Sequence, residues 1–359
     1  MGVVERLGRG TGDLMPESQP IGRTATGETV RRYRLRAGAL HADVMTYGAT
    51  LMALYTPDRS GKAGDIVLGF DTLAPYLAGA PCLGATVGRY ANRIANARFE
   101  IDGRTYRLAA NEGRNHLHGG LRGFDKVVWS AAPLEDGVAL RHVSADGGEG
   151  YPGELRVEVA YRLSADRLTI EYSARTTKPT HVNLTHHSYF NLSGAPSDIG
   201  DHLLQIDADR FAPVDRELIP TGELRGVANT PFDFRSARRI GASIEAGDPQ
   251  LIAAGGYDHT FVLNKSAPSA LTRAAALSEP ASGRRMEVWT TEPGLQFYSG
   301  NHLDGSLVGT AGPFIRRSGL CLEPQHFPDS PNRPEFPSTL LRPDGIYRSR
   351  TEFRFSVEP

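Results

Sequence analysis

Hydrophobic and polar residues alternate along much of this chain, most regularly between residues 155 and 172. Apolar residues occupy every second position as far as Leu163, polar residues 164–167 interrupt the pattern, and apolar residues return at positions 168, 170 and 172. A period of two is the period of a β-strand, and the interruption is typical of a turn. The segment is therefore predicted to form a β-hairpin with one buried face.

The same period predicts strands elsewhere in the chain. Residues 29–37 place Tyr33 and Leu35 between arginines, and residues 347–357 alternate in a similar way. Residues 99–108 contain two short apolar runs joined by Asp102-Gly103, a residue pair typical of a two-residue hairpin turn. Residues 284–299 have the pattern strand, turn, strand. Residues 238–254 are predicted to contain one or two short helices.

Two further segments bear on the organisation of the chain. Residues 44–55 are largely apolar and are broken by Gly48, which predicts one buried strand with a bulge or bend. Residues 1–20 are polar and glycine-rich, which indicates a loose N-terminal tail. No linker or internal repeat follows, so residues 21–359 are predicted to form a single domain.

Composition narrows the possible functions. The chain has 359 residues with 40 glycines and 24 prolines, which favours many turns and short strands. A formal net charge of −1 provides no basic face for nucleic acid, and no apolar run is long enough to cross a membrane. The two cysteines, Cys82 and Cys321, are far apart, and the first residues lack the apolar core of a signal peptide. We therefore expect a cytoplasmic protein that binds neither nucleic acid nor membranes.

Residues 180–194, THVNLTHHSYFNLSG, carry the densest group of candidate functional side chains. Polar and apolar residues are interleaved there, which suits an extended segment with one face in the core and one in a cleft. Neighbours on a strand point to opposite faces, so His186 and His187 are not expected to reach the same ligand. Histidine can give or take a proton near neutral pH. The alternative is one core histidine and one surface histidine.

Two segments earlier in the chain add possible donors. In GRYANRI, Asn92 and Arg93 are candidates to bind a sugar oxygen or a carboxylate, and a helical turn would put Arg89 and Arg93 on one face. The alternative is a solvated basic turn. In NHLHGG, an extended backbone would put His116 and His118 on one face, and the glycine pair would let the backbone approach a ligand. The histidine pair lacks the glutamate of a cupin-like metal site, so no metal is expected.

Three polar residues lie on predicted strands near the C-terminal end. Asp258 lies on the face opposite Tyr257, His259 and Phe261, and Gln296 is polar in a segment that otherwise looks buried. Glu323 follows the apolar residues 320–322, so partial burial would raise the pKa of its carboxyl and improve it as a base at neutral pH. The alternative for Glu323 is a paired structural carboxylate.

Six motifs, taken in order along the chain, resemble the aldose 1-epimerase (galactose mutarotase) family: GRYANRI, NHLHGGLRGFDKVVW, VNLTHHSYFNL, GGYDHTF, TEPGLQFYSGN and CLEPQHFPDSPN. The resemblance extends from about residue 20 to the C-terminus. It implies an all-β fold, a β-supersandwich of many mostly antiparallel strands, and an isomerase that interconverts the α and β anomers of hexoses such as glucose and galactose. It also implies that Glu323 is the general base and His187 the general acid. Substrate-binding positions implied by the resemblance are Arg93, His118, Asp258 and Gln296, with Asn92 as a neighbour. One departure is His186, where the family motif often has Asn.

The chemistry of anomer exchange agrees with these roles. A base takes the proton from the C1 hydroxyl, an acid protonates the ring oxygen O5, and rotation about C1–C2 precedes ring closure on the other face. Neither a cofactor nor a metal is required, and the partner is a small aldose. A monomer or a homodimer would serve.

Three other classes of protein fit parts of the pattern. A glycoside hydrolase would use two carboxylates, for which Asp258 and Glu323 are candidates. A carbohydrate-binding module would use aromatic platforms such as Trp129 without an acid and a base. A cupin-like isomerase would need a metal.

Overall fold

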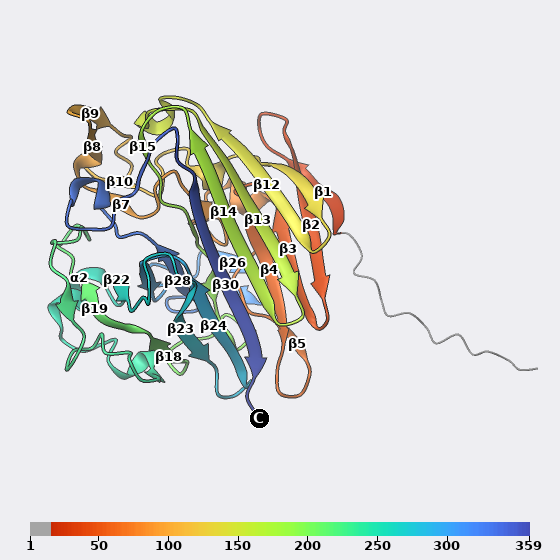
Figure 1. Cartoon of the computed structure of the whole chain (residues 1–359). Coiled ribbons are helices and arrows are strands. Elements are labelled where there is room, and N and C mark those ends of the chain that lie inside the picture. The colour runs from red at the N-terminus through yellow and green to blue at the C-terminus, as the bar shows by residue number, and fades with distance from the viewer. Residues whose placement is uncertain (1–15) are drawn as a thin grey trace, which may run out of the picture.

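The computed structural model describes residues 16–359, which form three larger β-sheets and five two-stranded ones (Figure 1). The largest sheet has nine strands in the order β11-β12-β13-β14-β30-β24-β23-β18-β21, all paired antiparallel. Its strands are β11 (Ser130–Leu134), β12 (Gly137–Ser144), β13 (Leu155–Ser164), β14 (Arg167–Thr176), β18 (Leu203–Ile206), β21 (Arg238–Arg239), β23 (Thr272–Ser278), β24 (Arg284–Thr290) and β30 (Tyr347–Val357).

A six-stranded sheet lies against this large sheet and carries much of the functional chemistry. Its order is β17-β28-β25-β22-β19-β20. The strands are β17 (Tyr189–Phe190), β19 (Ala208–Ala212), β20 (Arg225–Gly226), β22 (Asp258–Leu263), β25 (Gly294–Tyr298) and β28 (Leu320–Gln325). The third sheet is formed in chain order by β1 (Glu17–Arg23), β2 (Thr29–Ala37), β3 (Leu40–Met45), β4 (Thr50–Pro57) and β5 (Ala63–Asp65).

One hydrophobic core connects the three sheets. Side chains from the nine-stranded sheet, such as Val159 and Phe353, belong to the same buried cluster as Phe297 of β25, Leu322 of β28 and Leu35 of β2. Packing of one sheet on another buries the apolar face of each, while the outward faces stay polar. The fold is therefore the predicted all-β sandwich.

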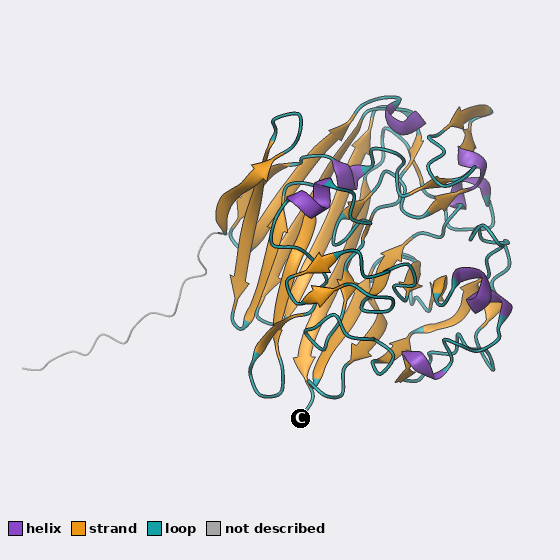
Figure 2. Cartoon of the chain, turned by 180° about the vertical axis from the view of Figure 1, so that it is seen from behind, coloured by secondary structure: helices purple, strands orange, loops and turns teal. Residues whose placement is uncertain are grey.

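Short strand pairs and helical turns occupy many of the connections between the longer strands (Figures 1 and 2). The pairs are β6 (Thr86–Val87) with β16 (Thr185–His186), β7 (Arg93–Ile94) with β10 (His116–Leu117), β8 (Arg98–Ile101) with β9 (Arg104–Arg107), β15 (Thr180–His181) with β29 (Leu340–Leu341), and β26 (Val308–Gly309) with β27 (Gly312–Pro313). The helices are α1 (Ala74–Leu77) and α2 (Pro249–Ala254), with 3₁₀ turns at Ala95–Ala97, Phe124–Lys126, Gly148–Gly150, Ile240–Ala242 and Ser330–Asn332.

Several predictions from the alternating pattern are confirmed. Strands β13 and β14 form the hairpin predicted over residues 155–172, and β8 pairs with β9 around the turn at Asp102-Gly103. Both turn residues have positive φ, as a two-residue turn of this kind requires. The final alternating run is β30, and the predicted helical segment contains Ile240–Ala242 and α2.

The prediction for residues 44–55 is wrong. The chain reverses at residues 46–49, and β3 and β4 pair antiparallel instead of forming one bent strand. Gly48 has a φ of 68° and lies in this reversal, because its conformation suits a tight turn better than the interior of a strand. An apolar run without a polar interruption gave no sign that it contained two strands.

Residues 1–15 of the predicted tail lie outside the described residues. Strand β1 begins at Glu17 and pairs with β2, so the last four residues of the predicted tail lie in a sheet. The single-domain organisation stays a prediction.

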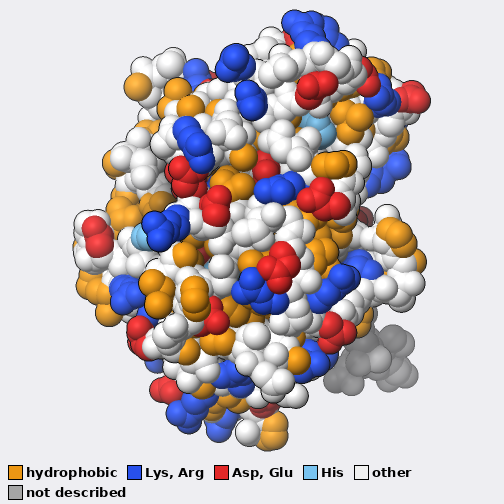
Figure 3. All heavy atoms as spheres, turned by 90° about the vertical axis from the view of Figure 1, so that its left-hand side faces the viewer, with side chains coloured by type: hydrophobic (Ala, Val, Ile, Leu, Met, Phe, Trp, Pro, Cys, Tyr) orange, Lys and Arg blue, Asp and Glu red, His pale blue; other side chains and the backbone are white. Residues whose placement is uncertain are grey.

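Two features of the described residues concern the protein's surroundings. None of their helices is long and apolar enough to cross a membrane. On the face shown in Figure 3, Lys and Arg side chains are interspersed with Asp and Glu side chains.

Candidate active site

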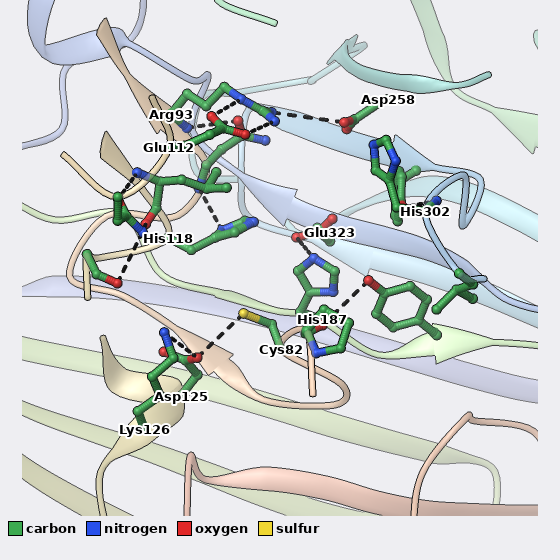
Figure 4. Close-up of a pocket in the computed structure, with 18 residues that line it drawn as sticks. Cys82, Arg93, Glu112, His118, Asp125, Lys126, His187, Asp258, His302 and Glu323 are labelled. Atoms are coloured by element: carbon green, nitrogen blue, oxygen red, sulfur yellow. Dashed lines mark hydrogen bonds and ion pairs between the residues drawn. The ribbon is translucent and has the colours of Figure 1, made fainter. Parts of the chain in front are cut away.

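A cavity of about 380 Å³ opens where the six-stranded sheet meets the loops of residues 81–126 (Figure 4). Six of the seven predicted site residues line it, namely Asn92, Arg93, His118, His187, Asp258 and Glu323, and only Gln296 is not in the lining.

 The aromatic side chains Tyr189 and Tyr298 also line the cavity. The fold thus gathers side chains from distant parts of the sequence into one pocket.

Glu323 and His187 face each other in this cavity. Glu323 lies on β28, and His187 lies between β16 and β17, the second of which pairs with β28. The Glu323 Oε2 atom is 3.8 Å from His187 Nε2, as the dashed line in Figure 4 shows. Both residues are buried, with exposed fractions of 2% and 6%, and Glu323 Oε2 has no hydrogen-bond partner among the described residues. A carboxylate and an imidazole are therefore held next to each other without being locked together.

Burial disfavours the charged form of each of these two groups. It raises the pKa of Glu323 well above its usual value, an effect that the nearby Asp258 increases and Arg93 opposes. Burial also lowers the pKa of His187 to about 4. These shifts favour a state in which the pair holds one proton, which is the state that can accept a proton at one point and donate one at another.

Arg93 is held by two carboxylates. Its Nε and Nη2 atoms each donate a 2.7 Å hydrogen bond to Glu112, and Nη1 lies 3.9 Å from Asp258 Oδ2. A bidentate arginine–carboxylate pair fixes the plane of the guanidinium. Arg93 therefore reaches the cavity in a defined orientation.

Gln296 supports the site from β25, where it pairs in register with Glu323. Its Nε2 atom donates a 2.6 Å hydrogen bond to Asp258 Oδ1, and its Oε1 atom accepts a hydrogen bond from Thr260. The amide thus connects Asp258 to the sheet and orients its carboxylate at the edge of the cavity.

His118 is placed by the backbone of Asn92. The Asn92 N–H donates to His118 Nδ1 at 3.2 Å, so the neutral imidazole carries its proton on Nε2. Burial, with contributions from His187 and Arg93, lowers the pKa of His118 well below its usual value. His118 is therefore a neutral hydrogen-bond donor in the wall of the cavity.

Two expectations about faces are wrong. His116 and His118 do not share a face, because His118 has a φ of 52° and the strand ends at Leu117. His116 bonds instead to Ala109 and Tyr151. Of the two glycines after His118, Gly119 packs closely against the chain, since a Cβ there would lie 1.8 Å from the Gly88 carbonyl oxygen, while Gly120 lines the cavity.

Arg89 and Arg93 do not share a face either, because residues 88–92 form no helical turn. Arg89 is buried and donates to the carbonyls of Ser144, Ala145 and Pro152. It is a structural residue, whereas Arg93 lines the cavity.

The two adjacent histidines point in different directions, as strand geometry predicts. His187 lines the cavity, while the His186 ring packs near Tyr161 and Phe353 in the core. Both are buried, so the alternative of a surface histidine is excluded.

Sequence reasoning missed other residues of the cavity. One of them is Glu112, which orients Arg93. Cys82, Asp125 and Lys126 form a second polar group. In this group, Asp125 Oδ2 lies 3.6 Å from Cys82 Sγ and 3.7 Å from Lys126 Nζ. Glu112 lies three residues before Asn115 in a polar loop, and no local pattern distinguishes it from a solvated charge. Only the pairing with Arg93 reveals its role.

Among the described residues, one set of side chains could hold a metal ion: His187, Cys321 and Glu323. The arrangement as a whole offers a carboxylate, an imidazole and several fixed hydrogen-bond partners in one cavity. That combination is suited to moving protons on a small polyhydroxylated ligand.

Comparisons with known proteins match the chain to one family. The family described as aldose 1-epimerase matches residues 31–354. The chain is similar to the galactose mutarotase of Bos taurus, at 47% identity over 331 residues that cover 92% of this chain and 95% of that protein. It is also similar to the aldose 1-epimerase of Escherichia coli K12, at 42% identity over 337 residues, 92% of this chain and 97% of that one. The crystal structure of galactose 1-epimerase from Lactobacillus acidophilus NCFM superposes with a TM-score of 0.84 at 29% identity, covering 96% of this chain and 99% of that chain.

Proposed function

The chain belongs to the aldose 1-epimerase family, and we propose that Glu323 and His187 are the base and the acid with which it interconverts the α and β anomers of aldoses. The observation that carries this assignment is the buried Oε2 atom of Glu323, which has no hydrogen-bond partner within residues 16–359 and faces His187 across 3.8 Å inside the cavity. A base needs a free lone pair, and an acid must lie within reach of the other end of the same hemiacetal.

The reaction follows from this pair. Glu323 takes the proton of the C1 hydroxyl while His187 gives a proton to O5, and the C1–O5 bond opens to the aldehyde. Rotation about C1–C2 turns the other carbonyl face towards O5. The two groups then reverse their roles, so that the ring closes and the pair again holds one proton.

Hydrogen bonds to the sugar come from the remaining site residues. His118 donates from Nε2 and Arg93 from its guanidinium, while Asp258, oriented by Gln296, accepts from two hydroxyls. Asn92 contributes by holding His118. Hexoses such as glucose and galactose are the proposed substrates, and galactose appears in the names of several similar proteins.

Polarimetry of freshly dissolved α-glucose and α-galactose tests the proposal. The enzyme should speed the approach to the equilibrium rotation of both sugars, and no change in rate would contradict it. A glycoside hydrolase, the second possibility for two carboxylates in a cleft, would instead release sugar from a glycoside.

The setting of the reaction is also a proposal. We infer that the enzyme works in hexose metabolism in the cytoplasm, because both cysteines are unpaired, as a reducing compartment favours. It acts as a monomer or a homodimer. Cell fractionation and sedimentation would test these two statements.

A further inference from the structure

Arg93 is shared among three carboxyl groups of the cavity (Figure 4). Its Nε and Nη2 atoms each donate a 2.7 Å hydrogen bond to Glu112. Its Nη1 atom lies 3.9 Å from Asp258 Oδ2, which is beyond hydrogen-bond distance. Its charge also opposes the rise that burial gives the pKa of Glu323. Of these three acids, within residues 16–359, Glu112 alone hydrogen-bonds to the guanidinium.

Glu112 lies in the loop between β9 and β10, which is braced by its own hydrogen bonds. The backbones of Glu112 and Asn115 exchange two hydrogen bonds. The Asn111 side chain bonds to both the N–H and the carbonyl of Leu117. The loop therefore holds the Glu112 carboxylate at the cavity, where its side chain is 35% exposed, and the bidentate pair fixes the plane of the Arg93 guanidinium.

Without this pair, Arg93 would turn to the acids on its other side. The gap of 3.9 Å to Asp258 closes to a hydrogen bond with a movement of about 1 Å. Arg93 and Asp258 would then bind each other instead of the sugar. Once Glu112 no longer neutralises it, the guanidinium charge would also stabilise the ionised form of Glu323 more strongly.

We propose that Glu112 is a positioning residue that holds Arg93 apart from Asp258 and Glu323, and so keeps both of these carboxylates free for the sugar. Glu112 acts through Arg93 and does not itself move a proton. The consequence for Glu323 rests on the proposed function, in which this residue is the base. The orientation of Arg93 for sugar binding does not depend on that role.

The variant Glu112→Gln removes the charge and keeps the size of the side chain. We expect kcat/KM for galactose to fall about 10–100-fold, as for a contact misplaced by about 1 Å, and mainly through KM. The alkaline limb of its pH profile should move to lower pH by about 0.5 pH unit or more, because the Arg93 charge then favours ionised Glu323. Polarimetry over a range of pH measures both effects.

A matched control comes from the same loop. Glu217 pairs with Arg114 at 2.9 Å, and its side chain is 43% exposed. Glu217→Gln should therefore leave KM and the alkaline limb unchanged. Action through Arg93 is tested in the Arg93→Met background, where adding Glu112→Gln should change neither quantity further.

Three outcomes would overturn the proposal. One is an alkaline limb that stays in place in folded Glu112→Gln. Another is an equal loss of kcat/KM in Glu217→Gln. The third is an effect of Glu112→Gln that persists in full in the Arg93→Met background.

Folding is checked by circular dichroism. If Glu112→Gln does not fold, Glu112→Asp serves instead: it keeps the charge, so the alkaline limb should stay in place, but its shorter side chain displaces Arg93, so KM should rise. An unchanged KM would count against the proposal.

Failure of the proposed function would be recognised separately. A wild type that does not speed anomer exchange rejects that function, and calorimetric titration with galactose then tests the positioning of Arg93 by itself. Glu112→Gln should weaken galactose binding about tenfold or more, as for a lost hydrogen bond to a charged group, and Glu217→Gln should not. Equal affinities of the wild type and Glu112→Gln would refute the positioning role.

Discussion

Glu323 is buried, and its Oε2 atom lies near His187 without a hydrogen-bond partner among the described residues. A substitution at this residue tests its proposed role as the base. Glu323→Gln keeps the size of the side chain and much of its hydrogen bonding but removes the base. Loss of one positioned base typically costs about 10²–10⁴-fold. We expect a fall of that order in kcat for both glucose and galactose, with a much smaller change in KM.

Polarimetry gives the rate of this variant, and circular dichroism checks its folding. A folded variant within about threefold of the wild-type rate, far less than a base contributes, would show that Glu323 is not the base. Asp258 would then be the next candidate.

The pH profile of kcat/KM should reflect the charges around Glu323 and His187. The rate should fall at acid pH, near the His187 pKa of about 4, because the pair then gains a second proton and loses its base. It should also fall at alkaline pH, as the pair loses its last proton. Asp258 raises the Glu323 pKa, so Asp258→Asn should move the alkaline limb to lower pH. An unmoved limb would contradict this coupling.

The adjacent histidines provide a matched comparison. His187→Asn should lose most of the activity, since His187 is the proposed acid, whereas His186→Asn should keep most of it because its ring lies in the core. Rates are measured by polarimetry and corrected for the folded fraction. Equal losses in the two folded variants would refute the assignment.

The sequence predicted which residues form the site better than it predicted how their side chains are oriented. Six of the seven predicted site residues line one cavity. They were singled out as a set by the resemblance to one family, since the local pattern alone left structural alternatives open. The relation between His116 and His118 could not be predicted, since it depends on one positive φ angle. Glu112 could not be singled out either, because its importance lies in its contact with Arg93, 19 positions earlier in the chain.

At the scale of elements, regular hairpins could be predicted and irregular segments could not. Strands β13 and β14 are long and alternate cleanly, so their register follows from which face is buried. Residues 180–194 instead contain three two-residue strands that pair with β29, β6 and β28. Tertiary contacts determine those pairings, so they cannot be predicted from the local alternation of polar and apolar residues.

One buried ion pair connects elements near the site. His326 follows β28, and Glu292 lies in the turn between β24 and β25. The His326 Nδ1 atom is 2.6 Å from Glu292 Oε2. Burial disfavours the charged form of both groups, but their mutual attraction and hydrogen bonding are stronger. The pKa of His326 is therefore raised and the pKa of Glu292 is lowered. A raised histidine pKa stabilises the fold below pH 6.5 and a lowered glutamate pKa does so above pH 4.5, so the full contribution lies between these values.

Glu292→Gln should therefore lower the free energy of unfolding most between about pH 4.5 and 6.5, by about 1.5–3 kcal/mol, as for a hydrogen bond to a charged group. The difference should shrink as pH rises through the His326 pKa and as it falls through the Glu292 pKa. Urea unfolding at several pH values measures it. Glu158→Gln, in the exposed pair with Arg141, is the control and should change stability little at any pH. A pH-independent difference for Glu292→Gln would contradict the ion-pair interpretation.

At the scale of the whole molecule, the site depends on the packing of sheets that are distant in sequence. The cavity takes residues from position 81 to position 323, and the core cluster runs from Tyr33 to Phe353. Fold class could be predicted because strand periodicity recurs along the chain and because the six motifs resemble one family. The number of sheets and their order could not, since they follow from which faces bury each other.

The continuous core predicts that residues 21–359 unfold as one unit, which tests the single-domain organisation. Removing β1–β5 alone would expose Leu35 and Val44 together with the side chains of the large sheet on which they pack, at a cost of about 25 cal/mol per Å² of apolar surface. The two tryptophans report on different places: Trp129 is buried beside Phe124, and Trp289 lies on β24 under Arg354. In urea, each of the variants Trp129→Phe and Trp289→Phe should give the same midpoint by the fluorescence of its remaining tryptophan and by circular dichroism. Two separate transitions, or midpoints that differ between the probes within one variant, would show that parts of the chain unfold independently and that it has more than one domain.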